Sequence, residues 1–523
     1  MTILGISAYY HDSSACLFKD GQLVYACEEE KFTGIKHDSS FPVNSIKYIF
    51  DHFVDKVDLV CYYEKPTLKI KRAFKHNLKS VPRILWTSIK LWFQLGQFNA
   101  PVHYSSHHNS HLAYAYYTSP FDKATVISID GVGEEDTICV AKAEYGRITP
   151  IKTTKYPHSL GLFYSAVTAF LGFKPNEGEY KVMGLASYGD PSVYSGAFNK
   201  LISHRDGIKT NMKYFTWDKS NDTMFNHHLI ELLGDNRLPN EPITQRHKDI
   251  AAALQQQYES MFFYLLNQHP GENLCLGGGC AYNGTANGKI KVYTDYKNIY
   301  IPQAPSDAGS CIGACLDYLG YHREVDKYLG PHFDTQIQGA RLLDLWLLAE
   351  ELYKGKVIGW YEGKIEFGAR ALGHRSILAS PTYPGMQDRI NKLIKKREMF
   401  RPFAPMVTYN AQSKYFYSND YVPYMNQVVK VREEYRDKLT AVTHVDGTAR
   451  IQSVKLEDND RIYRLLNLFG EHSGFPILLN TSFNIKDKTM VLYPEDALQT
   501  FWDTDIDILV INNQMIFKND KIN

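Results

Sequence analysis

The chain has 523 residues, of which 44% are hydrophobic and 22% are charged, and its formal net charge at pH 7 is +1. These values are ordinary for a globular protein, and the length is too great for one core, so we expect two to four domains. A net charge this close to zero gives no overall field that would draw the chain to nucleic acid or membrane, and we expect neither as a partner.

The eight cysteines are scattered along the chain and form no CxxC pair. This pattern predicts no disulfide framework and fits a reducing cytoplasm. The N-terminus has no basic region and begins like a strand, so it is not expected to be a signal peptide. The apolar run 84–98 is interrupted by Lys90 and Gln94 and is too short for a membrane span. We therefore expect a cytoplasmic protein.

Three short strands are predicted near the N-terminus, at residues 3–7, 15–18 and 22–26. Asp20-Gly21 between the second and third is a strong hairpin signal. The turn before the second strand contains His11, Asp12 and two serines. Such a turn can offer hydroxyl and N–H groups to a phosphate, but a plain surface turn is an equally good interpretation.

A basic segment follows at residues 65–83, with seven Lys or Arg and no acidic residue. A nucleic-acid patch is one interpretation of this composition. A solvated helix face, or a face that docks onto an acidic domain, is the favoured one because the segment contains few aromatic residues and a helix over 88–98 follows.

His107 and His111 are four residues apart in a predicted helix that Pro120 ends. This spacing places both imidazoles on one helix face. An apolar strand over 124–129 then ends at Asp130, the position at which open α/β sheets bind ligands. Surface HxxxH pairs are common, but the added carboxylate favours a site for Fe²⁺, Zn²⁺ or Mn²⁺, with Asp307 as a candidate fourth ligand.

Two glycine-containing segments predict a nucleotide site. Residues 177–185 are expected to form a loop whose glycines allow backbone to approach a ligand closely, and Glu179 and Lys181 could contact that ligand. A buried strand over 273–276 ends in a glycine triplet that begins Gly277-Gly278, and a helix with Asn283 follows. This order lets backbone approach a nucleotide closely, although it matches neither the dinucleotide-binding fingerprint nor the P-loop.

Residues 322–345 are expected to be a linker, and the composition changes beyond it. A strand over 357–360 is followed by cations interleaved with glycines and prolines, and a strand over 476–479 runs into a polar turn. The cations predict a pocket for a planar anion or a phosphate.

The ordered motifs YYHDSSACL, IKHDSSFP, HHNSH, SIDGVGE, EGEYKVMGLASYG, LGGGCAYNGTANGK, PSDAGSCIGA, EFGARALGHRSILASP, KKREMFRPFAP and LLNTSFN run nearly end to end. In them the chain resembles the NodU/CmcH-type O-carbamoyltransferases. The resemblance implies an α/β protein of two domains. Residues 1–340 would be similar to the actin-like (ASKHA, Kae/Tsa-like) fold, and residues 345–523 would form a YrdC-like domain.

The resemblance also implies a reaction. Carbamoyl phosphate is cleaved in the YrdC-like domain, and the resulting carbamate attacks the α-phosphate of ATP, giving carbamoyl-adenylate and pyrophosphate. The carbamoyl group then passes to a hydroxyl of a small molecule or sugar in the actin-like domain. A divalent metal, with Fe²⁺ favoured over Zn²⁺ or Mn²⁺, and ATP with Mg²⁺ as co-substrate are implied, and a monomer or homodimer is expected.

The family's site residues carry over by motif. The metal ligands are His107, His111, Asp130 and Asp307. The KxR…SxN signature is Lys395, Arg397, Ser482 and Asn484, with Arg370, Arg375 and Arg401 in the same pocket. The adenosine bed is Gly277, Gly278 and Asn283, with Lys181 and Gly184 nearby. The loops that face the acceptor and the adenylate carry His11, Asp12 and Lys36.

Two positions depart from the family pattern. Glu30-Lys31 replaces the usual Glu-Arg, and His374 stands where Asn is usual. Three other functions remain alternatives. A tRNA threonylcarbamoyl transferase would need a strongly basic surface. A sugar kinase would need neither HxxxH nor the second domain, and a non-catalytic nucleotide-binding protein would have no use for intact KxR, SxN and HxxxH motifs.

Overall fold

The computed structural model describes residues 1–205, 207–220, 222–398 and 400–520. The chain divides into two compact units. The first consists of Met1–Glu29 and His37–Val325, and the second of Glu30–Lys36 and Asp326–Asn523. The short N-terminal segment Glu30–Lys36 therefore belongs to the unit that is otherwise C-terminal, which boundaries drawn at residues 340 and 345 do not capture.

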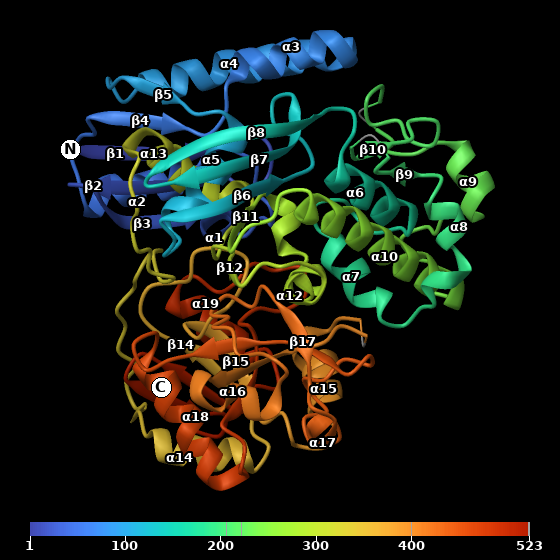
Figure 1. Ribbon diagram of the computed structural model, residues 1–523. Helices are drawn as coiled ribbons and strands as arrows, with labels where there is room; N and C mark the ends of the chain where they lie inside the picture. The colour runs from blue at the N-terminus through green and yellow to red at the C-terminus, as the bar shows by residue number, and fades with distance from the viewer. Residues whose placement is uncertain (206, 221, 399, 521–523) are drawn as a thin grey trace. The chain divides into compact units, whose positions relative to one another are not determined.

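The first unit contains two five-stranded sheets of the same topology (Figure 1). In each sheet three strands form an antiparallel meander, and two more strands add in parallel beside the first strand of the meander. The strands of the first sheet, in spatial order, are β3 (Gln22–Glu28), β2 (Ser14–Lys19), β1 (Thr2–Ser7), β4 (Leu59–Tyr62) and β5 (Val102–Tyr104). Those of the second are β12 (Asn298–Tyr300), β11 (Asn273–Gly277), β6 (Lys123–Ile129), β7 (Asp136–Glu144) and β8 (Arg147–Lys155).

Two helices of this unit pack against its sheets and against each other. Helix α13 (Ser310–Leu319) packs against β1 and β4, helix α5 (His107–Tyr117) packs against β6 and β11, and the two helices pack against each other. A Cβ atom at Gly313 would lie 1.9 Å from the carbonyl oxygen of Ser110, so only glycine permits this close crossing. The predicted α/β class is confirmed, and the two sheets repeat one strand arrangement.

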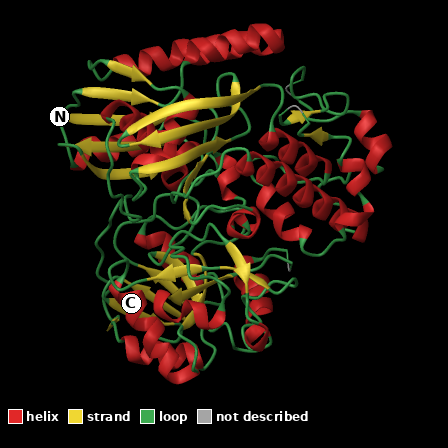
Figure 2. Ribbon diagram, viewed as in Figure 1, coloured by secondary structure: helices red, strands yellow, loops and turns green. Residues whose placement is uncertain are grey.

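A helical region of the first unit lies between β8 and β11 in the sequence (Figure 2). Its long helix α10 (Gln245–Asn267) begins at a capping box formed by Thr244 and His247, and it packs against three shorter helices. The shorter helices are α6 (Leu160–Phe170), α7 (Glu179–Ala186) and α8 (Ser195–Phe198). Residues 190–245 of this region hold α8, the two-stranded ladder β9 (Ile202–Ser203) with β10 (Lys209–Thr210), and α9 (His227–Leu233).

The loop predicted over residues 177–185 is wrong, because most of it is helix α7. Val182 and Leu185, one turn apart, are buried, and this apolar spacing outweighs the glycine at 184. Lys181 and Gly184 are therefore helical positions.

The second unit is built on one eight-stranded mixed sheet. Its strands, in spatial order, are β13 (Arg341–Leu342), β22 (Gln514–Phe517), β21 (Ile508–Ile511), β14 (Ile358–Tyr361), β15 (Arg375–Ala379), β20 (Ile477–Ser482), β16 (Ala404–Thr408) and β19 (Gln452–Val454). One core contains side chains of α14 (Leu345–Tyr353) and α18 (Asp460–Ser473), and the other contains side chains of α15 (Met386–Arg389), α16 (Tyr409–Tyr415) and α19 (Pro494–Trp502). A small ladder of β17 (Val428–Lys430) and β18 (Thr448–Arg450) completes the unit.

Part of the predicted linker is packed into this second unit. Tyr328 and Leu329 are 7% and 3% exposed. The ring of Tyr328 stacks on that of His374 with 3.4 Å between centroids, and its hydroxyl donates to the carbonyl of Leu372. No helix formed by the described residues is both long enough and apolar enough to cross a membrane.

Candidate functional site

Helix α5 places His107 and His111 one turn apart on its buried face. Their Nε2 atoms lie 3.1 Å apart, and both side chains are about 1% exposed. The helix begins at His107, whose backbone N–H donates to the carboxylate of Glu134. Glu134 accepts a second backbone N–H from Lys65, so it anchors the start of the helix that carries the histidines.

Two carboxylates complete the cluster. Asp130 directly follows β6, and its Oδ2 lies 2.9 Å from Nε2 of His107 and 3.0 Å from Nε2 of His111. Asp307 begins the turn η4 (Asp307–Gly309) before α13, and its Oδ1 lies 3.4 Å from Nε2 of His111. One ligand atom from each of the four residues lies within 4.8 Å of the others, and all four side chains are buried.

The donor set fits a divalent cation. Within the part of the chain that the structure describes, neither carboxylate oxygen of Asp307 has a hydrogen-bond partner, although the side chain is 0% exposed. Burying two carboxylates is costly unless a cation compensates them. Burial by itself would lower the pKa of His111, but Asp130 and Asp307 outweigh it and raise that pKa to about 9. The hydroxyl of Ser310 lies 3.2 Å from Nδ1 of His111, where it can orient the ring.

The predicted pair His11 and Asp12 lies next to this centre. A third residue, His37, joins the pair, and the sequence did not indicate it. Asp12 Oδ2 is 2.8 Å from Nδ1 of His11, and its Oδ1 is 2.6 Å from Nδ1 of His37. His11 Nε2 lies 3.8 Å from Oδ2 of Asp307. Asp12 and His37 both have a positive φ, a strained conformation that is common at functional sites.

Charges govern the protonation of this group. Burial would lower the pKa of His11, but the carboxylates of Asp307 and Asp12 raise it to about 10. Burial would raise the pKa of Asp12, but His11 and His37 hold it well below its usual range. Lys36, which was predicted to act with His11 and Asp12, belongs to the second unit.

The glycines of the predicted nucleotide bed are packed against protein backbone. A Cβ atom at Gly277 would lie 2.8 Å from the carbonyl oxygen of His111, and one at Gly278 would lie 2.3 Å from that of Ile129. Gly278 also has φ +84°, which favours glycine. These residues let β11 approach α5 and β6, which brings the Gly279 N–H within 3.3 Å of Oδ1 of Asp130. The triplet therefore lies against the cluster of His107, His111, Asp130 and Asp307.

The remaining residues of this predicted bed lie on helices. Asn283 caps the short helix α11 (Gly284–Asn287) by accepting from the N–H of Ala286, and its amide donates to Gln255 on α10. Lys181 and Gly184 lie on α7, which also packs against α10.

In the second unit, the structure brings the KxR and SxN motifs together. Lys395 ends the π-helical turn η5 (Ile390–Lys395), and its buried Nζ donates to the backbone carbonyl and hydroxyl of Ser482 and to both oxygens of Asn484, over distances of 2.5–3.2 Å. Burial, and then the cations of Arg397, Arg401 and Lys36, holds the pKa of Lys395 well below its usual range. Such a crowd of cations favours a bound anion.

The predicted arginines differ in their surroundings. Nε of Arg397 donates to Oδ1 of Asn391 at 2.8 Å, and its guanidinium lies over the ring of Phe403. Arg401 forms an ion pair with Glu398 at 3.6 Å, and both arginines retain partial exposure. Arg370 is also partly exposed.

Arg375 is different because it is fully buried. Its guanidinium donates to the backbone carbonyls of Glu362, Gly363 and His374 and lies 3.6 Å above the ring of Tyr361. These contacts engage the guanidinium group that the sequence analysis assigned to a substrate anion.

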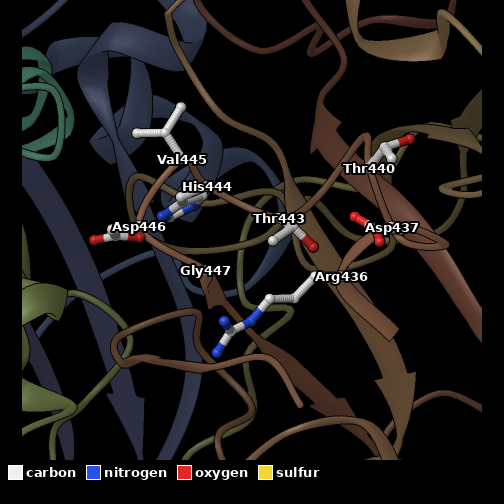
Figure 3. Close-up of a pocket in the computed structure, with 8 residues that line it drawn as sticks. All are labelled: Arg436, Asp437, Thr440, Thr443, His444, Val445, Asp446 and Gly447. Carbon is white, nitrogen blue, oxygen red and sulfur yellow. The ribbon is translucent and has the colours of Figure 1, made fainter. Parts of the chain in front are cut away.

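A hollow of about 420 Å³ elsewhere in the second unit contains none of the predicted residues (Figure 3). It is lined by Arg436, Asp437, Thr440, Thr443, His444, Val445, Asp446 and Gly447. Asp437, Thr440, Val445 and Asp446 are exposed, so this is a surface feature and we assign it no role.

Comparison with known proteins gives the family. The model described as "Carbamoyltransferase N-terminus" matches residues 2–316, and that described as "Carbamoyltransferase C-terminus" matches residues 349–518. An uncharacterized protein of Synechocystis (sll1178) is 40% identical over 99% of this chain and 96% of its own length. Nodulation protein NolNO of Sinorhizobium fredii is 35% identical over 98% of this chain and 80% of its own length.

A relative whose name states an activity is also similar. The 3'-hydroxymethylcephem-O-carbamoyltransferase of Streptomyces clavuligerus is 30% identical over 73% of this chain and 74% of its own length. Among solved structures, component A of the Acidaminococcus fermentans (R)-2-hydroxyglutaryl-CoA dehydratase is 18% identical, covers 61% of this chain and 99% of its own, and has a TM-score of 0.36, too low to support an argument. The two family models together span nearly the whole sequence, and the chain belongs to the carbamoyltransferase family.

Proposed function

We propose that the chain is an ATP-dependent O-carbamoyltransferase that modifies a hydroxyl of a small molecule or sugar. The observation that carries this proposal is the buried centre of His107, His111, Asp130 and Asp307, in which both oxygens of Asp307 lack a hydrogen-bond partner among the described residues. Membership of the family indicates that the group transferred is a carbamoyl group. The centre offers the ligands for a divalent cation that would lie next to this group.

The proposed reaction has three balanced steps. Water cleaves carbamoyl phosphate to carbamate and phosphate. A carbamate oxygen then attacks the α-phosphorus of ATP, forming carbamoyl-adenylate and releasing pyrophosphate. Finally the acceptor oxygen attacks the carbamoyl carbon, AMP leaves, and the hydroxyl proton passes to a base. Mg²⁺ would accompany the ATP.

We assign the first two steps to the second unit, whose cation cluster suits phosphate and carbamate. Arg397 and Arg401 can donate charge-assisted hydrogen bonds to anionic oxygens. Ser482 and Asn484 hold the ammonium group of Lys395 in place. Burial and the repulsion between these cations lower the pKa of Lys395, and a bound anion would offset the repulsion. We propose a YrdC-like fold for this unit on the strength of this motif pairing.

We assign carbamoyl transfer to the first unit, for which the duplicated sheet supports an actin-like fold. His107, His111, Asp130 and Asp307 would hold Fe²⁺, or alternatively Zn²⁺ or Mn²⁺. The cation's contribution when bound is to polarise the carbamoyl carbonyl.

His11 is the proposed proton acceptor in the first unit. Asp12 fixes its ring through Nδ1 and leaves Nε2 facing the centre. The negative charge of Asp307 raises the pKa of His11, so a cation on Asp307 would lower that pKa toward a value suited to a base. His37 supports Asp12 from its other oxygen.

The experiment that tests this function is exchange of labelled pyrophosphate into ATP. Exchange that requires carbamoyl phosphate is expected for carbamoyl-adenylate formation. A sugar kinase or a nucleotide-binding protein without this chemistry would give none, and a tRNA threonylcarbamoyl transferase would not depend on carbamoyl phosphate. Hydroxylated metabolites and sugars can then be screened for the mass increase of one carbamoyl group.

A further inference from the structure

Two helices of the first unit leave most of their surface uncovered. Helices α3 (Pro66–His76) and α4 (Val81–Gly96) follow one another through the short turn η1 (Leu78–Ser80), and Figure 1 shows them drawn in line along one edge of their unit. Few of their residues are buried: Ala73, Ser80, Val81, Leu91 and Leu95. We call this pair, residues 66–96, the α3–α4 arm.

The arm presents a second apolar face to the outside. Trp86, Trp92 and Phe93 are 66–69% exposed, and Ile89 is 50% exposed. Leu85, Ile89 and Trp92 are spaced three and four residues apart, so they share a helix face that lies beside the one carrying the buried Leu91 and Leu95. Phe74 and Leu78 extend the exposed apolar residues toward α3. A continuous group of large exposed apolar side chains marks an interaction site.

The arm is also strongly basic. From Lys65 to Phe121 the chain has no Asp or Glu, and eight Lys or Arg lie between Lys65 and Lys90. The whole chain has a net charge of only +1, so the remainder is net negative and positive charge is concentrated on the arm. Lys71, Lys75, Lys79 and Arg83 are exposed, and none of these four forms an ion pair with the described residues.

We propose that the α3–α4 arm binds the surface of an anionic lipid bilayer, with both helices lying in the plane of the interface. A helix that has tryptophan, phenylalanine and leucine on one face and lysine or arginine beside it matches this binding mode. Trp86 and Trp92 would sit at the headgroup level, where indole rings are favoured. Lysine stems would cover apolar surface while their ammonium groups reach lipid phosphates or carboxylates. Peripheral binding of this kind requires no spanning helix.

Charge and shape weigh against other occupants of the arm. A second copy of the chain would place one basic arm against another, and the like charges would repel. Nucleic acid would satisfy the lysines but would leave Leu85 and Ile89, which lie between the aromatic residues, without apolar contact. An acidic protein would also satisfy the charges, and the vesicle experiment distinguishes this occupant from lipid.

The test is flotation of the purified full-length chain with vesicles. One set is phosphatidylcholine alone, and the other contains about a third phosphatidylserine. We expect binding to the anionic vesicles only, weakened by added salt. Trp86→Ser with Trp92→Ser should lower the bound-to-free ratio by about tenfold or more, and Lys75→Glu with Lys79→Glu should do the same. The two variants remove different contributions, so the test does not depend on one of them folding.

Exposed residues elsewhere in the first unit provide matched controls. Val292→Ser removes an apolar side chain that is 75% exposed, and Lys152→Glu reverses an exposed charge on β8. Both should bind anionic vesicles like the unaltered chain. The proposal is overturned by equal binding to both kinds of vesicle, by no binding, or by arm variants that match these controls. Self-association that Trp92→Ser removes, without vesicle binding, would instead assign the arm to a second copy. The outcome is independent of carbamoyl transfer.

Discussion

The Nε2 atoms of His107 and His111 lie 3.1 Å apart, and both face the same carboxylate oxygen of Asp130. Two ring nitrogens this close, which both face one carboxylate oxygen, can converge on a single cation. The i, i+4 spacing on α5 sets their separation, and β6 brings Asp130 to the open side of the pair. The structure thus prepares a ligand set before any ion arrives.

We predict that His111→Ala loses bound metal and carbamoyl transfer but keeps carbamoyl-phosphate-dependent pyrophosphate exchange. Removing one of four ligands weakens metal binding, whereas the exchange reaction is assigned to the other unit. Metal content by elemental analysis and both activities would be measured on the same preparation. His103→Ala, which removes a partly exposed histidine outside the cluster, is the control. Full metal content together with full transfer in His111→Ala would refute the centre.

A second prediction concerns the anion pocket. Arg397→Ala should abolish carbamoyl-adenylate formation, because each charge-assisted hydrogen bond to the phosphate or carbamate contributes about 1.5–3 kcal/mol. Pyrophosphate exchange measures the loss, and metal content should stay at the level of the unaltered chain. Arg464→Ala removes an arginine that is 65% exposed on α18 and serves as the control. Adenylate formation at the normal rate in Arg397→Ala would move this active site elsewhere.

The sequence predicted the local elements of the candidate metal centre well. The pattern around HxxxH before Pro120 predicts a helix and the apolar run before Asp130 predicts a strand, and helix α5 and strand β6 confirm these two elements. It also named Asp307, but only the parallel pairing of β6 with β11 and the packing of α13 on α5 explain how residues 177 positions apart in the chain meet. Contacts of that kind depend on topology, which a single sequence does not encode in any short window.

Other features escaped prediction for specific reasons. His37 was missed because it contacts Asp12 across 25 residues of irregular chain. The glycines within residues 177–185 favour a loop in the sequence, whereas burial of Val182 and Leu185 stabilises helix α7 in the structure. Arg375 is of a residue type that often binds anions, but its hydrogen-bond partners are backbone carbonyls. No sequence motif reveals the positions of those carbonyls.

A third prediction concerns His374, one of the two positions that depart from the family pattern. His374 stacks on Tyr328, and burial lowers the pKa of its imidazole to about 3. The folded state therefore binds fewer protons than the unfolded state below about pH 6.5, and the stability contributed by neutral His374 is full above that pH and falls as the pH drops toward 3. His374→Asn, the usual family residue, should remove this part of the acid sensitivity.

The measurement is the melting temperature of both proteins at pH 7.5 and pH 5. The drop between the two should be smaller for His374→Asn, by an amount that corresponds to about 1–2 kcal/mol. The variant loses the stacked ring at both pH values, so the diagnostic quantity is the difference in melting temperature between them. His332→Asn, at an exposed position, should keep the original drop. An identical drop in all three proteins would show that His374 is protonated as readily in the folded chain as in the unfolded one.

The last prediction concerns the intermediate. Carbamoyl-adenylate is a mixed anhydride that water destroys, so an enzyme that makes it in one unit and uses it in the other should keep it from solvent. Asp307→Ala removes a ligand of the first unit's centre, and Arg397→Ala removes an anion ligand of the second. If the adenylate stays with the chain that made it, an equimolar mixture of the two variants should remain inactive in transfer, since neither chain can complete both steps.

Asp307→Ala must retain pyrophosphate exchange and Arg397→Ala must retain metal, which shows that each keeps its intact half. Synthetic carbamoyl-adenylate supplied to Arg397→Ala should restore transfer, because this shows that its acceptor site works once the intermediate is present. Near-complete recovery of transfer on mixing would establish a freely diffusing intermediate and contradict retention.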